Sequence, residues 1–260
     1  MRLDVFLVEC GLFDSRQKAK EAIQSRIIEL NGTITQKPSF EVSLDSTPQI
    51  TILEPHYVSR AAYKLKGFFD EIDFKKQHFK AIDVGAARGG FTQILLEYGA
   101  REVWSIDVGS NQLHPLLRQN PNVKVYEHCD IRDFAKTHAQ INPQMTPKTI
   151  TQARAHKNNS YVQFDLLVCD VSFIEISKIF DALQTLSDEM ILLFKPQFEV
   201  GKGTKRNKKG VVQDRKLIDD TLATLCKFIQ TQGFRILTIT PSTLKGKEGN
   251  EEFFIHTKKQ

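Results

Sequence analysis

Residues 81–92 read AIDVGAARGGFT, an apolar run followed by a glycine-rich turn and the start of a helical stretch at 91–98. The turn has the form D-x-G-x-x-x-G, from Asp83 through Gly85 to Gly89. Glycine lets the backbone turn tightly and approach a ligand with no Cβ in the way. Ligands bind at the carboxyl ends of the strands in an open parallel sheet, so this turn is the first candidate for a ligand site.

The segments that follow predict the rest of the sheet. Strand candidates at 102–107, 123–126, 165–170 and 190–194 lack polar alternation, and helical stretches at 111–119, 175–187 and 215–232 separate most of them. Apolar strands joined by helices indicate a parallel sheet covered on both faces. Residues 234–239 and 252–257 are joined without a helix, which predicts an antiparallel last pair. The predicted class is α/β: a Rossmann-like, doubly wound sheet with a terminal antiparallel hairpin.

The front of the chain, residues 1–53, predicts a small α+β domain. Apolar residues recur there at helical spacing in two segments, and Asp14 and Ser15 stand where the second helix should begin. Asn31-Gly32 lies between β-prone runs and predicts a tight hairpin, with further short strands at Val42 and 50–53. We expect a linker at 54–63, a second domain at 64–260 and, within it, a mobile insertion in the polar run at 138–160.

Composition excludes several classes of protein. The 260 residues are 40% apolar and 26% charged, and the longest apolar runs, such as 190–194, are far short of the ~18 residues that a membrane helix needs. The amino terminus has no apolar signal core, and the four cysteines are widely spaced, which argues against secretion, disulfides and a metal site. We therefore expect a cytoplasmic protein without a membrane segment. The net charge of +5 is too mild to identify a partner by itself.

Acids at the strand ends predict what the glycine turn binds. Ala87 stands at the third position of the dinucleotide fingerprint G-x-G-x-x-G, which needs a glycine there, so a nucleoside without pyrophosphate fits better than a nicotinamide or flavin cofactor. Asp107 ends the next strand, 24 residues after Asp83, where an acid can accept hydrogen bonds from both ribose hydroxyls. Asp130, after the third strand, is placed to approach an adenine amine; a solvated acid with no such role is equally consistent.

Asp170 and Lys195 follow the fourth and fifth strands and should face the same cleft. An apolar strand that runs directly into Lys195 would partly desolvate this amine, which favours a base, although a solvated strand-end lysine is the simpler alternative. A basic loop follows, with Lys202, Lys205, Arg206, Lys208 and Lys209. Such loops are usually solvated surface, but at the mouth of a cleft this one is placed to contact a phosphate backbone.

Six motifs together carry a resemblance that spans nearly the whole chain. They are YVSR at 57–60, DVGAARGGFT at 83–92, CDVSFI at 169–174, FKPQFE at 194–199, KGVV at 209–212 and GNEEFF at 249–254. With these motifs the chain resembles the TlyA family of ribosomal RNA methyltransferases, often labelled haemolysin A. The front part resembles the RNA-binding domain named after ribosomal protein S4, and the rest resembles the FtsJ-like methyltransferase fold.

The resemblance implies an S-adenosylmethionine-dependent enzyme that methylates the ribose 2′-hydroxyl of a cytidine in 23S ribosomal RNA. It implies ribosomal RNA of the large subunit as the partner, with no obligate protein partner and no membrane. Because the chain lacks extra residues at both ends, it looks like the shorter type, restricted to 23S RNA. The family's Lys-Asp-Lys-Glu tetrad falls on Lys64, Asp170, Lys195 and Glu252, with Glu251 as the fallback for the last.

The same resemblance, taken with the strand-end argument, gives two sets of binding residues. The expected cofactor site comprises Asp83, Gly85, Ala86, Gly89, Gly90, Phe91, Thr92, Asp107, Val108, Asp130 and Asp170. The expected RNA contacts are Arg2, Arg16, Lys18, Lys20, Arg60, Lys202, Lys205 and Arg206, with Arg26 and Lys37 as further candidates. Two departures from the family stand out: Ala61-Ala62 replaces Gly-Gly, and Ala87-Arg88 replaces Ser-Thr, which brings a cation toward a site that receives a sulfonium.

The hypothesis for the chemistry is that neutral Lys195 removes the ribose proton, while Asp170 and Glu252 orient the two amines and balance their charge. Nearby Lys64 and the sulfonium would disfavour the protonated form of Lys195. Three alternatives remain. A membrane-active haemolysin would need an apolar span or a strongly amphipathic helix, a non-catalytic RNA-binding protein would fail to bind S-adenosylmethionine, and a nicotinamide-dependent enzyme is disfavoured by Ala87.

Overall fold

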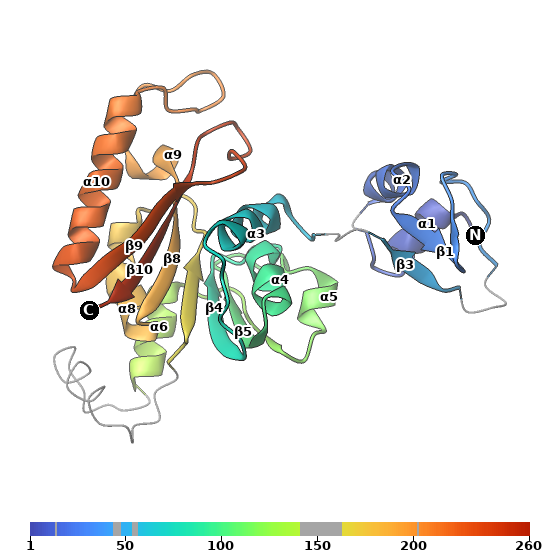
Figure 1. Cartoon of the computed structure of the whole chain (residues 1–260), viewed down its shortest axis with the longest axis horizontal. Coiled ribbons are helices and arrows are strands. Elements are labelled where there is room, and N and C mark those ends of the chain that lie inside the picture. Colours follow the sequence, from blue (N-terminus) through green and yellow to red (C-terminus); the bar gives the residue numbers. More distant parts are fainter. Residues whose placement is uncertain (14, 44–47, 54–56, 141–162, 202) are drawn as a thin grey trace. The chain divides into compact units, whose positions relative to one another are not determined.

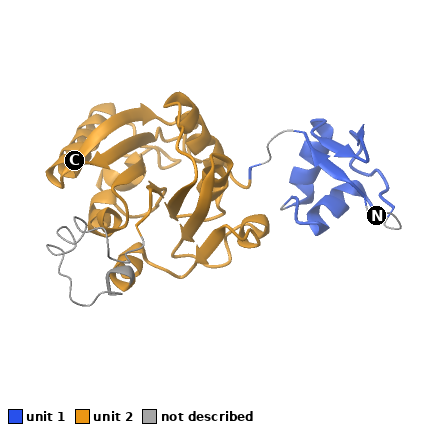
Figure 2. Ribbon diagram, turned by 60° about the horizontal axis from the view of Figure 1, so that its bottom comes forward, with its two compact units in different colours: residues 1–57 blue, residues 58–260 orange. Residues whose placement is uncertain are grey.

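The chain folds into two compact units, Met1–Tyr57 and Val58–Gln260 (Figure 2). A computed structural model describes residues 1–13, 15–43, 48–53, 57–140, 163–201 and 203–260, the side chains of 138–140 excepted. The second unit begins earlier than the sequence predicted, because Val58 is buried and Arg60 opens a helix within the segment expected to be a linker. Of the insertion expected at 138–160, residues 138–140 end a helix and the rest lies outside the described residues.

The smaller unit packs two helices and a three-stranded antiparallel sheet around one apolar core. Its elements are α1 (Leu3–Glu9), α2 (Arg16–Gln24), β1 (Ile28–Leu30), β2 (Thr33–Ile34) and β3 (Ile50–Ile52), with the strands in the order β2-β1-β3. Ser15 caps α2 by accepting a hydrogen bond from the amide of Lys18 at 3.3 Å. Asn31 and Gly32 have φ of 49° and 77°, the left-handed values of a two-residue hairpin turn.

Two of the sequence predictions for this unit concern Val42 and Asp14. Val42, expected in a strand, is instead a single buried core residue whose amide donates to the carbonyl of Met1 at 2.7 Å. The segment around it therefore pairs with the chain's start rather than with the sheet. Asp14, the other expected cap of the second helix, lies outside the described residues.

The larger unit holds one seven-stranded sheet in the order β6-β5-β4-β7-β8-β10-β9 (Figure 1). The strands are β4 (Phe79–Val84), β5 (Ala100–Ile106), β6 (Val123–Tyr126), β7 (Leu166–Cys169), β8 (Glu189–Phe194), β9 (Phe234–Pro241) and β10 (Phe253–Lys259). β4 to β8 run parallel, and β10 is antiparallel to both β8 and β9. The predicted parallel sheet with a terminal antiparallel hairpin is confirmed.

Helices cover both faces of this sheet. They are α3 (Arg60–Glu71), α4 (Gly90–Glu97), α5 (Pro115–Arg118), α6 (Ile131–Gln140), the 3₁₀ turn η1 (Ile176–Lys178), α8 (Phe180–Leu186), α9 (Pro196–Glu199) and α10 (Arg215–Thr231). Neighbouring residues on a strand point to opposite faces. Phe253 accordingly packs into the core shared with α6, α8 and α10, whereas the ring of Phe254 stacks 4.6 Å from that of Phe68 on α3. Both faces are therefore buried, which explains why the strands lack polar alternation.

The helices differ from the sequence prediction in two ways. α3 and α6 were not among the expected helical stretches, and the stretch expected at 111–119 is helical only over Pro115–Arg118. In the part of the chain that the structure describes, every helix is too short or too polar to cross a membrane.

Candidate active site

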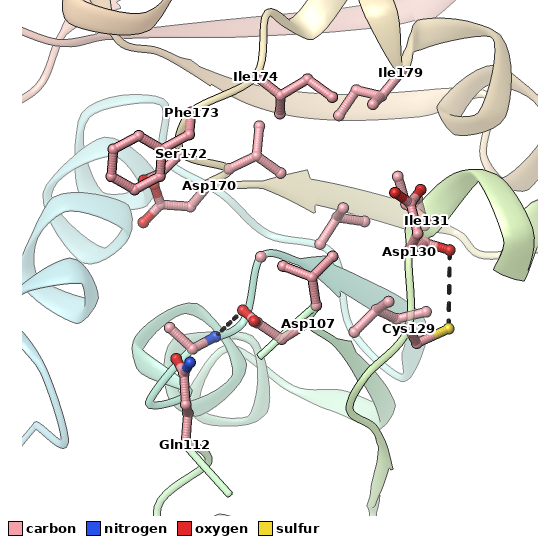
Figure 3. A pocket seen from close by; sticks show the side chains of 16 residues that line it. Asp107, Gln112, Cys129, Asp130, Ile131, Asp170, Ser172, Phe173, Ile174 and Ile179 are labelled. Atoms are coloured by element: carbon pink, nitrogen blue, oxygen red, sulfur yellow. Dashed lines mark hydrogen bonds between the residues drawn. The ribbon is translucent and has the colours of Figure 1, made fainter. Parts of the chain in front are cut away.

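A cavity of about 320 Å³ opens at the carboxyl ends of β4, β5, β6 and β7 (Figure 3). Its walls come from the loops that follow these four strands, and they combine apolar side chains with the carboxylates of Asp107, Asp130 and Asp170. β4 lies between β5 and β7, where the strand order reverses. This is the crevice in which open parallel sheets bind ligands, and the volume is in the range of small-molecule sites.

Gly85 is a position in the turn that tolerates no side chain. Its φ is +84°, and a Cβ added there would lie 2.7 Å from the backbone oxygen of Asp170. The absence of a side chain therefore lets the turn after β4 pack directly against the loop after β7, and both loops line the cavity.

Asp107 holds the cavity wall together through backbone amides. One carboxylate oxygen accepts a hydrogen bond from the amide of Ala87 at 2.8 Å (Figure 3). The other accepts one from the amide of Gly109 at 2.7 Å. Ala87 has a left-handed φ of 45°, which is uncommon for a residue with a side chain. Asp107 thus joins the glycine-rich turn to the loop after β5, and its own carboxylate lines the cavity.

The expected cofactor residues divide into two groups. Gly85, Asp107, Val108, Asp130 and Asp170 line the cavity, whereas Asp83, Ala86, Gly89, Gly90, Phe91 and Thr92 do not. The residues of the second group are buried and stabilise the turn from inside the fold. The hydroxyl of Thr92, for example, donates a hydrogen bond to the carboxylate of Asp83 at 2.7 Å. The lining residues that the sequence did not predict include Gln112, Cys129 and Phe173. Cys129 and Phe173 lie close to the strand-end acids Asp130 and Asp170, and only that position could have identified them.

Two further expectations concern charge near the cavity. Asp130 is held by Arg132 in a 2.6 Å ion pair, and this pairing is the main cause of the lowered pKa of its carboxyl group. Arg88, expected to bring a cation to the cofactor, does not line the cavity. Its guanidinium donates to the carbonyl of Val58 at 3.3 Å, which turns the charge toward the start of the larger unit.

The four tetrad residues converge as two ion pairs. Lys64 on α3 lies 2.6 Å from Glu252, just before β10, and Lys195, after β8, lies 2.5 Å from Oδ1 of Asp170. All four side chains are at most 14% exposed. Burial raises the pKa of Asp170, and the charges of Lys195 and Lys64 oppose that shift. Two amines and two carboxylates are thus held together at the edge of the cavity, which Asp170 itself lines.

The structure also separates Glu252 from its fallback. Glu252 accepts hydrogen bonds from Lys64 at 2.6 Å and from the amide nitrogen of Gln197 at 3.3 Å. Glu251 instead pairs with Arg215, and its side chain is 43% exposed. Successive residues of an extended chain face opposite sides, so only one of these two acids can meet Lys64.

The expected RNA contacts are mostly surface side chains, and three of them also bind groups of this chain. Arg2 and Arg16 pair with the fully buried Asp4 at 2.9 and 3.2 Å, and the bond from Arg2 is the main cause that lowers the pKa of Asp4 to about 2. Arg206 donates to the carbonyls of Gln197, Gly201 and Thr204, so it holds its own loop. Lys18, Lys205 and Arg60 are exposed, as are Arg26 and Lys37; Lys20 is half-buried, and Lys202 lies outside the described residues.

Two known protein families match this chain, one for each of its two units. A family model described as an FtsJ-like methyltransferase matches residues 57–259, and an S4 domain model matches residues 1–47. The chain belongs to the FtsJ-like methyltransferase family. Its S4 domain and its full-length relatives place it among the TlyA-type members of that family, so the resemblance noted from the motifs is confirmed.

Three relatives show the extent of the likeness. "23S rRNA (cytidine-2'-O)-methyltransferase TlyA" of Campylobacter jejuni is 37% identical, over 98% of each chain. "16S/23S rRNA (cytidine-2'-O)-methyltransferase TlyA" of Mycobacterium tuberculosis is 33% identical, over 100% of this chain and 90% of its own length. A solved structure named as a hemolysin from Streptococcus thermophilus is 29% identical with a TM-score of 0.65, covering 100% of this chain and 88% of that one.

FtsJ-like methyltransferases take their methyl group from S-adenosylmethionine, and the cavity fits this donor. Within the described part of the chain, the residues that line the cavity include three carboxylates and no lysine or arginine, which suits a ligand that carries a sulfonium and an amine. Asp107 is placed to accept from ribose hydroxyls, and the apolar wall of Ile106, Ile131 and Ile179 suits an adenine ring.

We expect Asp107→Ala to weaken S-adenosylmethionine binding about 10- to 100-fold, measured by titration calorimetry. The change removes a charged acceptor from two backbone amides and from the ligand's ribose, and a hydrogen bond to a charged group contributes about 1.5–3 kcal/mol. Asp133→Ala, an exposed acid on α6 that does not line the cavity, is the matched control and should leave the affinity unchanged. An Asp107→Ala variant that binds as tightly as the wild type would remove Asp107 from the site.

Asp83 should make the folded protein less stable as pH rises toward neutrality. Burial raises its pKa from 3.8 to about 7, so the folded protein keeps a proton that the unfolded chain loses above pH 4. The free energy of unfolding should therefore fall between about pH 4 and pH 7, by on the order of a few kcal/mol. Asp83→Asn should flatten this decline in urea titrations at several pH values. An identical decline in the variant would show that another group causes it.

Proposed function

We propose that this chain transfers a methyl group from S-adenosylmethionine to the ribose 2′-hydroxyl of a cytidine in 23S ribosomal RNA. The observation that supports this function most strongly is the buried pairing of Lys64 with Glu252 and of Lys195 with Asp170 at the edge of the cavity. The restriction to 23S RNA rests on the Campylobacter relative, which matches over 98% of both chains and is named for 23S RNA alone. A substrate of this kind also implies a cytoplasmic location.

Each residue of the tetrad has a distinct task in this proposal. A protonated ribose hydroxyl is a poor nucleophile, so its proton has to leave as the oxygen attacks in line. The ε-amine of Lys195 takes that proton, and Asp170 holds the amine and stabilises the positive charge that results. Lys64 and Glu252 form a second pair that balances charge beside the first. When bound, S-adenosylmethionine supplies an electrophilic methyl group on a sulfonium.

Two basic loops of the larger unit extend the proposed RNA-binding surface. The loop that carries Lys205, Lys208 and Lys209 is joined to the turn before β10 through Asn250, whose side-chain oxygen accepts from the amide of Val212 at 3.0 Å. The segment between β9 and β10 adds the exposed Lys245 and Lys247, which the sequence reading omitted. Both loops project beyond the carboxyl ends of the strands (Figure 1). Lysines placed there meet the phosphates of an RNA strand whose ribose reaches Lys195.

Charge reversal of the second loop should lower both RNA affinity and its salt dependence. For Lys245→Glu/Lys247→Glu, we expect the slope of log K against log salt to become less steep by about one to two. The control is Lys216→Glu/Lys227→Glu, which makes the same change of charge at exposed positions on α10. Filter binding of a 23S RNA fragment at several salt concentrations measures both. Equal slopes for the two double variants would exclude the loop from the RNA interface.

The proposed function is tested by mapping methylated nucleosides in ribosomal RNA from cells with and without this protein. The proposal predicts one 2′-O-methylcytidine in 23S RNA that disappears with the protein and returns with the wild-type gene. An RNA methylation pattern that does not depend on the protein would refute it. Because one relative, from Brachyspira hyodysenteriae, is named "Hemolysin A", leakage of liposomes by the purified protein is the parallel test of the membrane-active alternative.

A further inference from the structure

Ser172 is a polar neighbour of Lys195 that has no role in the chemistry described so far. Its hydroxyl oxygen accepts a hydrogen bond from the Lys195 ammonium at 3.1 Å. The ammonium also donates to the main-chain oxygen of Asp170 at 3.5 Å. The Asp170 carboxylate is closer still, with Oδ1 at 2.5 Å, and its hydrogen bond and its charge both stabilise the ammonium. Three acceptors therefore surround the amine of Lys195: the carboxylate of Asp170, the hydroxyl of Ser172 and, at the longest distance, the main-chain oxygen of Asp170.

The backbone around Ser172 is fixed at several points. The amide of Asp170 donates to the carbonyl of Val84 at 2.9 Å, and the amide of Ile176 donates to the carboxylate of Glu199 at 2.9 Å. Between them, Phe173 adopts a φ of +66°, in the left-handed region. Such conformations cost energy and persist only where the surroundings enforce them. The loop from Asp170 to Ile176, which carries the hydroxyl, is thus anchored at both ends.

Ser172 itself is exposed and lines the cavity beside Asp170 (Figure 3). Packing does not account for a serine at this place, because the side chain is not enclosed. Its hydroxyl, however, connects a lysine that is only 8% exposed with the space in which the methyl donor and the ribose have to meet.

We propose that Ser172 is a positioning residue for Lys195: its hydroxyl accepts one N–H of the amine and so fixes the direction of the lone pair that receives the ribose proton. A neutral amine has two N–H groups and one lone pair. When the carboxylate of Asp170 and the hydroxyl of Ser172, the two nearer acceptors, take the two N–H groups, only one direction is left for the lone pair. The inference rests on the proposed function, since it needs Lys195 as the proton acceptor.

The test compares Ser172→Ala with Ser172→Thr in methyl transfer to 23S RNA as a function of pH. In Ser172→Ala the second N–H turns to the more distant main-chain oxygen of Asp170, so the lone pair changes direction. We therefore expect kcat at the plateau to fall about tenfold while KM for RNA stays within about threefold. The hydroxyl also stabilises the ammonium form, so its loss should move the acid limb of the kcat profile to lower pH by roughly half a unit to one unit. Ser172→Thr keeps the hydroxyl and should restore both.

The outcomes are separable. A Ser172→Ala variant with the wild-type kcat and acid limb overturns the inference, and so does a fall in kcat with an unmoved limb, since a merely structural role would produce it. Identical behaviour of the alanine and threonine variants also overturns it. Titration of each variant with S-adenosylmethionine shows whether the cavity is intact. Failure of the proposed function is a different result: the wild-type protein itself would transfer no methyl group to the ribose.

Discussion

Lys195→Ala should lower kcat for methyl transfer by about 10³-fold or more while leaving the affinity for S-adenosylmethionine within about threefold of the wild type. General-base catalysis contributes about 10²- to 10⁴-fold, and Lys195 also contacts the one tetrad acid that lines the cavity. Single-turnover transfer of a labelled methyl group to 23S RNA measures the first quantity, and calorimetry measures the second.

Lys195→Arg separates the proton acceptor from the charge. A guanidinium keeps the positive charge beside Asp170 but does not lose its proton in a protein, so this variant should be as inactive as the alanine variant. Lys216→Ala, at an exposed position on α10, is the control for the loss of a lysine. Substantial transfer by Lys195→Arg would contradict a base at this position and would favour a purely electrostatic role.

Lys64→Met should both abolish transfer and destabilise the fold by about 3–5 kcal/mol. The carboxylate of Glu252 is 2% exposed, and its ammonium partner lies 2.6 Å away. Removing one member of a buried ion pair leaves an uncompensated charge in the interior, which is the costly case. The free energy of unfolding from urea titration measures this loss.

The double variant Lys64→Met/Glu252→Leu separates stability from function. Replacing both members of a buried pair with apolar groups is often neutral for stability, so the double variant should regain most of what the single variant loses. Methyl transfer should not return, because the proposal needs the charges of Lys64 and Glu252 beside the pair of Lys195 and Asp170. An active double variant would show that the pair serves only the fold. A double variant as unstable as the single one would show that Glu252 does not account for the loss.

The sheet could be predicted because each strand is a local pattern. Apolar runs such as Met190–Phe194 are buried on both faces, and the turns between them lie at the strand ends, so the class of the sheet follows from the sequence alone. The order of the strands in the sheet came only from the structure. The two overlooked helices also carried a signal: Leu65, Phe68 and Phe69 in α3 and Ile131, Phe134 and Ala135 in α6 recur at helical spacing. Neither helix was predicted, because α3 begins within the expected linker at 54–63 and α6 runs into the expected insertion at 138–160.

The site could be predicted only in part. Asp107, Asp170 and Lys195 follow buried strands, and parallel topology brings such ends to one edge. Lys64 lies on a helix, and Glu252, 188 positions later, lies just before an antiparallel strand. No local pattern places the two in one site, and only the family resemblance predicted that both belong to it. The pairing of each lysine with its own acid, and of Arg2 and Arg16 with Asp4, depends on three-dimensional packing that sequence spacing does not encode.

The proposed function specifies which atom finally carries the transferred methyl group, namely the ribose 2′-oxygen of a cytidine. Purified protein, isotopically labelled S-adenosylmethionine and 23S RNA lacking the modification should yield, after digestion to nucleosides, label in 2′-O-methylcytidine and in no base-methylated nucleoside. The label should vanish with Lys195→Ala. A methyl group found on a base, or transfer that persists without Lys195, would contradict the assignment of this site.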